Sequence, residues 1–173
     1  MTIVLDLDHC LIYASYSELE GLPLIGKRGY LHLYHRPGLD QFLTFLAKMK
    51  NWDIVFYTSS KASYARWVIK SMSVPFEYQL FSRSNTKKKY TEIGEVYLKS
   101  LAKIEMKVEN SDRRTIVLDD RPDLWDETGV ELVSIDPWHG ELSDTELEQA
   151  IRRIIKIAHK KNVRSLNLNL KRQ

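Results

Sequence analysis

The chain has 173 residues, of which 43% are hydrophobic and 28% are charged, and its formal net charge is +3 at pH 7. This composition fits one domain with its own core, spanning residues 1–173, and so small a charge permits an anionic substrate without indicating nucleic acid. No apolar run approaches the roughly 20 residues of a membrane span, no signal or transit peptide is visible, and the one cysteine, Cys10, excludes an internal disulfide, so we expect an intracellular protein, cytoplasmic or nuclear. As a separate expectation, we take the protein to be a monomer.

Strands and helices alternate through the first half of the chain. Apolar runs and apolar residues at helical spacing predict strands over 2–5, 30–34 and 53–57 and helices over 39–49 and 60–72. Glycines and a proline predict an irregular stretch over 15–29. This order predicts an α/β fold, a Rossmann-like parallel sheet flanked by helices, with a small irregular or β insert.

The second half of the chain is less regular. The alternation in residues 76–80 predicts a short strand, the polar and basic residues 82–89 predict a loop, and the apolar spacing of residues 93–104 predicts a helix with Lys99 on or near it. Then follow a charged turn over 109–114, strands over 115–119 and 130–135, and a last helix that starts in a capping box at Ser143–Glu146 and extends to Ala158. No pattern follows Asn162, so we expect a disordered tail there.

Acids and a hydroxyl follow three of the predicted strands. Residues 115–119 repeat residues 2–6 letter for letter, and the two copies run on to further acids, Asp120 and Asp8. The strand between them in the chain ends at Thr58. If these strands lie parallel in one sheet, their polar ends meet at the carboxyl edge, where open α/β sheets bind ligands.

The acids at this edge suit phosphoryl transfer. A buried carboxylate is costly without a counter-charge, which predicts a metal ion beside Asp6 and Asp8. Magnesium prefers oxygen ligands, and Asp119 and Asp120 can complete its site. Asp6 can attack phosphorus as a nucleophile, while Asp8 can protonate the leaving oxygen and later activate water.

Other polar side chains can bind the phosphate. Thr58 offers a hydroxyl and a backbone N–H for a phosphate oxygen, and Lys99 can add the positive charge that a metal alone does not supply. Each also has a structural interpretation, because Thr58 can be an ordinary strand-end hydroxyl and Lys99 a solvated helix residue. The three lysines at 87–89 are interpreted as a solvated loop.

An ordered set of motifs resembles the haloacid dehalogenase superfamily. The motifs are Asp6-Leu7-Asp8-His9-Cys10-Leu11, Tyr57-Thr58-Ser59-Ser60 and Leu118-Asp119-Asp120-Arg121-Pro122-Asp123. Within that superfamily, the chain resembles the RNA polymerase II C-terminal-domain phosphatases and the NLI-interacting-factor-like proteins in Arg36-Pro37-Gly38, in residues 119–125 and in residues 143–147. The resemblance extends from Thr2 to about Ala158.

This resemblance implies a role for each residue of the predicted site. The nucleophile is Asp6 and the acid/base is Asp8; the phosphate binders are Thr58, Ser59, Lys99 and Arg36; the Mg²⁺ site comprises Asp6, the carbonyl of Asp8 and Asp120, together with Asp119, which also holds the lysine. Lys88 is a rival to Lys99, and Arg36 can instead simply anchor the turn before Pro37. The implied protein is a magnesium-dependent phosphatase of phosphoserine or phosphothreonine in a phosphorylated protein or peptide, acting through an aspartyl-phosphate.

Two alternatives remain open on the sequence alone. The same centre can serve a small phosphomonoester or a nucleic-acid 3′-phosphate, and a domain of this family can be a catalytically silent binding module. His9 and Cys10 depart from the family's first motif, which usually has Thr or Val in place of Cys10. We interpret both as packing variants and expect activity to survive.

Overall fold

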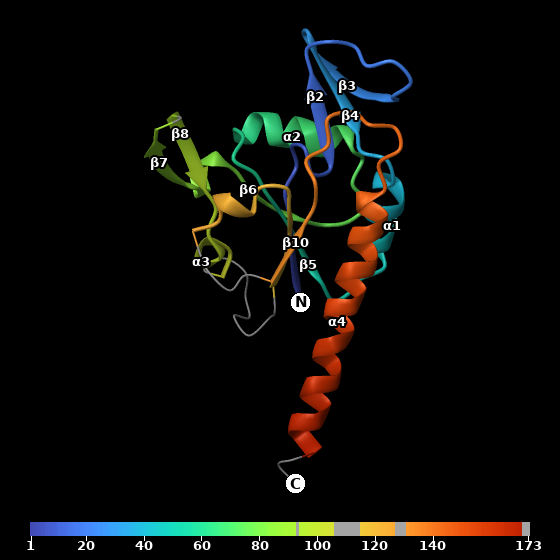
Figure 1. Ribbon diagram of the computed structural model, residues 1–173, viewed down its shortest axis with the longest axis vertical. Coiled ribbons are helices and arrows are strands. Elements are labelled where there is room, and N and C mark those ends of the chain that lie inside the picture. The colour runs from blue at the N-terminus through green and yellow to red at the C-terminus, as the bar shows by residue number, and fades with distance from the viewer. Residues whose placement is uncertain (93, 106–114, 127–130, 171–173) are drawn as a thin grey trace.

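A five-stranded parallel sheet forms the centre of the computed structural model, which describes residues 1–92, 94–105, 115–126 and 131–170 (Figure 1). In sheet order the strands are β10 (Glu131–Ser134), β9 (Thr115–Asp119), β1 (Thr2–Leu5), β5 (Asp53–Tyr57) and β6 (Gln79–Phe81). All four strand pairs are parallel. The predicted α/β fold is therefore confirmed, with the two Thr-Ile-Val-Leu-Asp copies side by side.

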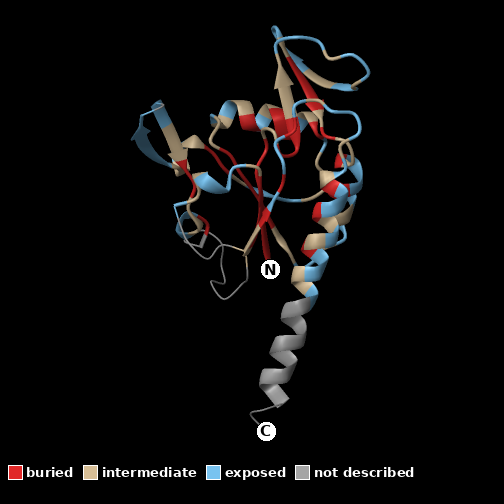
Figure 2. Ribbon diagram, viewed as in Figure 1, coloured by how far each residue is buried: buried red, intermediate tan, exposed pale blue. Residues whose placement is uncertain are grey.

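Helices cover the two faces of this sheet unequally. The helices are α1 (Leu39–Ala47), α2 (Ala62–Ser71), α3 (Leu101–Glu105) and α4 (Glu146–Leu170). The face that bears Ile3 and Leu5 packs against buried residues of α1, α2 and α4, whereas the face that bears Val4 packs against Ile104 of α3. Burial on both faces explains why the central strands read as unbroken apolar runs (Figure 2).

A small antiparallel sheet stands at one end of the molecule, above α2 (Figure 1). Its order is β2 (Ile12–Ser15), β4 (Leu31–His35) and β3 (Leu24–Arg28). The β insert and the strand near residues 30–34 are confirmed, but the irregular stretch predicted over 15–29 is wrong where β3 forms. The register between β3 and β4 shifts between Leu24 and Gly26, as it does at a β-bulge.

A hairpin of β7 (Lys87–Thr91) and β8 (Gly94–Leu98) replaces two predicted elements. The loop predicted over 82–89 contains the short 3-10 helix η1 (Arg83–Asn85) and most of β7, and the helix predicted over 93–104 is present only as α3. The apolar spacing of this segment is compatible with a strand as well as with a helix. Antiparallel pairing between β7 and β8 stabilises the extended conformation. Lys99 thus follows a strand instead of lying on a helix.

The last helix begins and ends differently from its prediction. Asp144 Oδ1 accepts the backbone N–H of Glu146 at 3.1 Å, so Asp144 caps the helix instead of the Ser143 expected from the capping box. The helix continues to Leu170, past the expected start of a disordered tail, and no glycine or proline follows Gly140 to end it. The charged turn predicted over 109–114 lies outside the described residues. Within the described residues, no helix is long and apolar enough to cross a bilayer.

Candidate active site

The parallel register brings the predicted acids together at the carboxyl edge of the sheet. Leu5 of β1 lies beside Leu118 of β9, so Asp6 and Asp119 leave neighbouring strands at the same level. The backbone N–H of Asp6 donates to the carbonyl of Leu118 at 3.0 Å, which continues the ladder one residue past the strand. Both carboxylates are therefore fixed on rigid backbone at the place where the sequence predicts a ligand site.

Lys99 bridges these two acids. Its Nζ lies 2.5 Å from Asp6 Oδ1 and 2.7 Å from Asp119 Oδ2, and its side chain is almost fully buried. Burial alone would lower the pKa of Lys99, but Asp6 and Asp119 together raise that pKa above its ordinary value. The side chain of Lys99 is consequently a protonated ammonium, held in place at the C-terminal end of β1. Lys88, the rival, pairs with Glu95 on the exposed hairpin.

Asp119 holds the lysine, the role that the resemblance implies. Its Oδ1 accepts the backbone N–H of Arg121 at 2.8 Å, and its Oδ2 accepts both Lys99 and the indole N–H of Trp125 at 2.9 Å. Both oxygens of Asp119 therefore have protein partners, while the metal-ligand role that the sequence also predicts for Asp119 stays a prediction.

Asp120 has the opposite character, since it offers an oxygen without a partner. Its Oδ1 is buried and has no hydrogen-bond partner among the described residues. Burial and the nearby Asp119 raise the pKa of Asp120, and burial raises the pKa of Asp6 against the opposing Lys99 ammonium. One oxygen of each of Asp6, Asp119 and Asp120 lies within 4.8 Å of the others. This excess of buried acid over the single ammonium fits a hard divalent cation such as Mg²⁺.

Asp8 lies beside this cluster but has different partners. Its Oδ2 accepts the hydroxyl of Ser60 at 2.9 Å and its Oδ1 accepts the hydroxyl of Tyr64 at 2.5 Å. Burial and then Asp8 raise the pKa of Tyr64, so this phenol stays protonated and donates. The side chain of Asp8 therefore has partners of its own outside the group formed by Asp6, Asp119 and Asp120, and a metal contact through the Asp8 carbonyl stays a prediction.

Thr58 and Ser59 lie at the same edge, after β5. Thr58 Oγ1 accepts the backbone N–H of Ser60 at 3.0 Å, which leaves the hydroxyl proton of Thr58 free to donate to an anion. Its backbone N–H donates to the carbonyl of Phe81 at 3.1 Å, so the expectation that this N–H binds phosphate is wrong. The N–H is used instead to extend the ladder between β5 and β6. Ser59 Oγ donates to the carbonyl of Tyr97 at 3.2 Å.

A cleft of about 280 Å³ opens over these residues. It is lined by Asp6, Asp8, His9, Thr58, Ser59, Ser60, Arg83, Lys99, Asp120, Arg121 and Leu124. The guanidinium of Arg83 donates to the carbonyl of Ser59 at 2.7 Å and lies 4.4 Å from the ring centroid of Tyr97. The cleft therefore combines an acidic floor with cations at its wall, which is the arrangement that a phosphate held through a metal requires.

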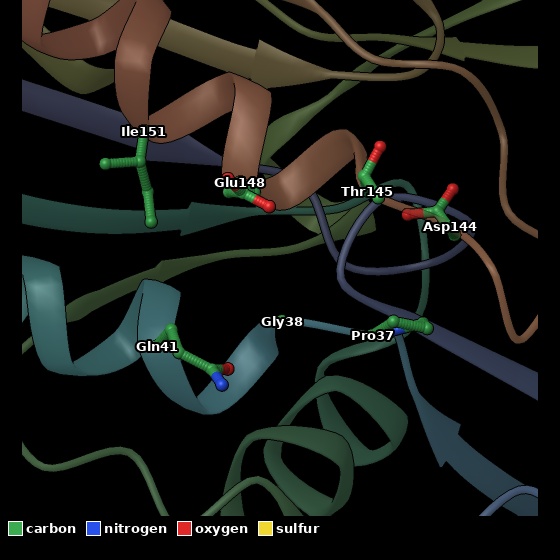
Figure 3. A pocket seen from close by; sticks show the side chains of 7 residues that line it. All are labelled: Pro37, Gly38, Gln41, Asp144, Thr145, Glu148 and Ile151. Atoms are coloured by element: carbon green, nitrogen blue, oxygen red, sulfur yellow. The ribbon is translucent and has the colours of Figure 1, made fainter.

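Arg36, which the resemblance placed near the phosphate, does not line this cleft. It is fully buried, and its Nε and Nη2 donate to the two oxygens of Asp144 at 2.8 and 2.7 Å. Its Nη1 donates to the carbonyls of His9 and Cys10 at 3.3 and 3.2 Å. A separate hollow of about 230 Å³ between α1 and α4 is lined by Asp144, and none of the strand-end acids lines it (Figure 3). Arg36 thus anchors the turn, its alternative interpretation.

The sequence did not single out Ser60, Tyr64, Arg83, Arg121 and Trp125 as site residues. Tyr64 lies within the helix predicted over 60–72 from apolar spacing, and only its hydroxyl departs from that pattern. Ser60 follows Thr58 by two residues within the recognised motif, so its position was an available signal. Cys10 is fully buried, as expected of a packing residue, whereas His9 lines the cleft.

Comparisons with known proteins match most of the chain. A family described as NLI interacting factor-like phosphatase matches residues 1–164. The human CTD small phosphatase-like protein is 23% identical over 159 residues, which cover 84% of this chain and 51% of that protein. An RNA polymerase II C-terminal domain phosphatase of Encephalitozoon cuniculi is 27% identical over 132 residues, which cover 73% of this chain and 29% of that protein.

A solved structure agrees in fold. The structure of Fcp1, described as an essential RNA polymerase II CTD phosphatase, has a TM-score of 0.55 and 22% identity, covering 94% of this chain and 50% of that one. The chain spans about half the length of the first curated relatives and of this structure. The five-stranded parallel sheet therefore has a known counterpart.

Proposed function

The chain belongs to the NLI interacting factor-like phosphatases, and on this premise we propose that it is a magnesium-dependent phosphatase of phosphoserine or phosphothreonine in a protein, acting through an aspartyl-phosphate on Asp6. One observation supports this proposal above the others. Lys99 Nζ lies 2.5 Å from Asp6 Oδ1 and 2.7 Å from Asp119 Oδ2, at the floor of a cleft that also contains Asp8.

The first half of the reaction transfers the phosphoryl group to the protein. A carboxylate oxygen of Asp6 attacks phosphorus, and the bond between phosphorus and the ester oxygen breaks. Asp8 gives its proton to that oxygen, which leaves as the side-chain hydroxyl of the substrate. Lys99 and the Thr58 hydroxyl stabilise the charge that builds up on the other phosphate oxygens.

The second half of the reaction regenerates Asp6. The carboxylate of Asp8 takes a proton from a water molecule, whose oxygen attacks phosphorus. The bond between phosphorus and Asp6 breaks, and inorganic phosphate leaves the cleft. Bound Mg²⁺ would be held by Asp6, the carbonyl of Asp8 and Asp120, and it supplies positive charge that lets a phosphate approach carboxylates.

The protein substrate and an intracellular location belong to this proposal as well. Two relatives of this chain are named as phosphatases of the C-terminal domain of RNA polymerase II. Their names support a phosphorylated protein segment as the class of substrate, and we propose serine or threonine as the phosphorylated residue. The cationic wall that Arg83 adds beside the phosphate position is compatible with such a substrate.

Phosphate release from phosphoserine, phosphothreonine and phosphotyrosine peptides and from an aryl phosphate tests the proposal. We expect release from the first two peptides that requires Mg²⁺, is lost with chelator and is lost in Asp6→Asn, while the exposed acid variant Asp136→Asn keeps full activity. Release from small monoesters alone would contradict the protein substrate. No release from any substrate, with tight binding of an unphosphorylated peptide, would favour the silent binding module.

Binding of Mg²⁺ has a test that does not use turnover. A ligand that binds only the folded state raises the melting temperature. We expect Mg²⁺ to raise the melting temperature of the wild-type chain but not that of Asp120→Asn, in which the oxygen without a partner is replaced by an amide. An equal rise in both chains would contradict the metal assignment.

A further inference from the structure

Two hydroxyl groups converge on the carboxylate of Asp8. Ser60 Oγ donates to Oδ2 at 2.9 Å and the Tyr64 hydroxyl donates to Oδ1 at 2.5 Å. We propose that Ser60 and Tyr64 are positioning residues that aim Asp8 at the leaving oxygen, and that they adapt the cleft to phosphate esters of aliphatic alcohols. The inference rests on the proposed function and extends it by naming the two residues and the substrate chemistry that depends on them.

Rigid backbone presents both hydroxyls. Ser60 lies between β5 and α2, and its backbone N–H donates to Thr58 Oγ1 at 3.0 Å, which fixes the loop. Tyr64 follows four residues later in the first turn of α2, where its backbone N–H donates to the carbonyl of Lys61 at 3.0 Å. Its ring lies 5.8 Å from that of Trp67, at a tilted angle. Neither hydroxyl depends on a long, flexible side chain.

The two hydroxyls reach Asp8 from different sides. Ser60 lines the phosphate cleft together with Asp8. Tyr64 instead lines an adjoining hollow of about 370 Å³, which shares Asp8, His9, Ser60 and Arg83 with the cleft. One donor on each oxygen fixes both the rotamer and the plane of the carboxyl group, whereas a single donor would leave it free to rotate. Tyr64 therefore supports Asp8 without occupying the space of the phosphate.

The partners of Asp8 also differ in charge from those of its neighbour Asp6. Asp6 pairs with the Lys99 ammonium, whereas in the part of the chain that the structure describes the carboxylate of Asp8 is bound by two neutral hydroxyls and by no lysine or arginine. A cation would compete with the substrate for this carboxyl group and would favour its ionised form, whereas Asp8 must carry a proton in the first half of the reaction. Neutral donors orient Asp8 and leave it available to the leaving oxygen.

The orientation of Asp8 matters most for poor leaving groups. As the bond between phosphorus and the ester oxygen breaks, an aliphatic oxygen must receive a proton from Asp8, because an alkoxide is too basic to leave unaided. A nitrophenolate leaves without that proton. Misplacing Asp8 therefore slows hydrolysis of alkyl phosphates far more than hydrolysis of aryl phosphates, and serine and threonine esters are alkyl phosphates.

The experiment compares kcat/KM for a phosphoserine peptide, for a small alkyl phosphate and for nitrophenyl phosphate in Tyr64→Phe, Ser60→Ala and the double variant. We choose kcat/KM because it reports the steps up to departure of the leaving group. We expect a loss of about 10- to 100-fold on both alkyl esters in the double variant and a loss under about threefold on nitrophenyl phosphate. Ser60→Thr, which keeps the hydroxyl, should restore most of the loss caused by Ser60→Ala.

Two controls separate positioning from a structural role. Tyr30→Phe removes a phenol that is 86% exposed and should change nothing. In an Asp8→Asn background, adding Tyr64→Phe should have no further effect on alkyl esters, since the residue it positions is gone. Equal losses on alkyl and aryl esters, undiminished alkyl activity in the double variant, or the same loss in the Asp8→Asn background would each overturn the inference.

The outcomes also separate this inference from the proposed function. Leaving-group dependence with small alkyl phosphates but no activity on peptides would sustain the positioning role and contradict the protein substrate. Peptide activity that is indifferent to both hydroxyls would sustain the function and contradict the positioning role. A wild-type chain inert toward every monoester would contradict both.

Discussion

Lys99 and Arg36 are both buried cations paired with carboxylates, yet only one of them lines the cleft. Lys99 lies between Asp6 and Asp119, at the carboxyl edge of the central sheet. Arg36 contacts the carbonyls of His9 and Cys10, which follow Asp8 in the chain, and pairs with Asp144, which caps α4. Two sites of similar charge and burial therefore have different consequences for function.

The number of donors left over distinguishes the two cations. Four of the five N–H groups of Arg36 donate within the described part of the protein, to Asp144 and to the carbonyls of His9 and Cys10. Two of the three N–H groups of Lys99 donate to Asp6 and Asp119, which leaves one for a substrate oxygen. A buried cation whose N–H groups nearly all bind protein atoms stabilises the fold. A buried cation with an N–H group left over beside a cleft can also bind a ligand.

Removing Arg36 should have the largest effect, and the effect should be on stability. Arg36→Met removes the guanidinium that neutralises the largely buried Asp144 carboxylate and takes a donor from two carbonyls, so we expect the free energy of unfolding to fall by about 3–5 kcal/mol. Urea denaturation measures this change. Arg36→Met with Asp144→Leu should recover part of the loss, because the apolar pair no longer buries a lone charge. Unchanged stability with a collapse of turnover would instead place Arg36 at the phosphate.

Removing Lys99 should affect chemistry more than folding. Lys99→Met deletes the charge nearest to Asp6, and we expect turnover of the phosphoserine peptide to fall about 10²- to 10³-fold. Bound Mg²⁺ offsets the loss of the ammonium beside Asp6, so the chain should remain folded in its presence. Steady-state kinetics and a melting curve, both with Mg²⁺, measure the two effects. A folded variant with normal turnover would show that Lys99 serves the fold in the way that Arg36 does.

The different roles of Lys99 and Arg36 could be predicted from the sequence only in part, and the reasons are physical. Asp6, Thr58 and Asp119 were predictable as neighbours because each lies at the end of an apolar strand, and parallel strands end at the same edge of a sheet. The place of Lys99 depends on the β7–β8 hairpin, whose pairing the local pattern did not reveal. Asp144, the partner of Arg36, is 108 residues away in the sequence, and no local pattern near Arg36 predicts this contact. Contacts set by strand ends were predictable, and contacts set by distant side chains were not.

Alkaline pH should weaken the ion pairs of Lys99 with Asp6 and Asp119, because the lysine loses its charge, whereas the arginine pair of Arg36 with Asp144 keeps its charge. Asp6 and Asp119, working against burial, raise the pKa of Lys99 in the folded state above the unfolded value. The stabilisation is therefore complete below the ordinary lysine pKa and is lost as pH rises through the raised folded value. As pH rises above about 10.4, the free energy of unfolding of the wild-type chain should fall more steeply than that of Lys99→Met. Parallel curves would contradict the raised pKa.

Lys88 gives the smallest expected effect and settles which lysine the cleft uses. The sequence left Lys88 and Lys99 as rivals for the lysine of the site. In the structure, Lys88 Nζ is 2.6 Å from Glu95 on the exposed hairpin and does not line the cleft, so Lys88→Met removes the same charge and stem as Lys99→Met without touching Asp6. We expect its turnover on the phosphoserine peptide to stay within about twofold of wild type, because an exposed pair is screened by solvent. An equal loss of turnover in Lys88→Met and Lys99→Met would contradict this expectation. It would mean that the β7–β8 hairpin moves over the cleft when substrate binds and that Lys88 is a further cation acting on the phosphate.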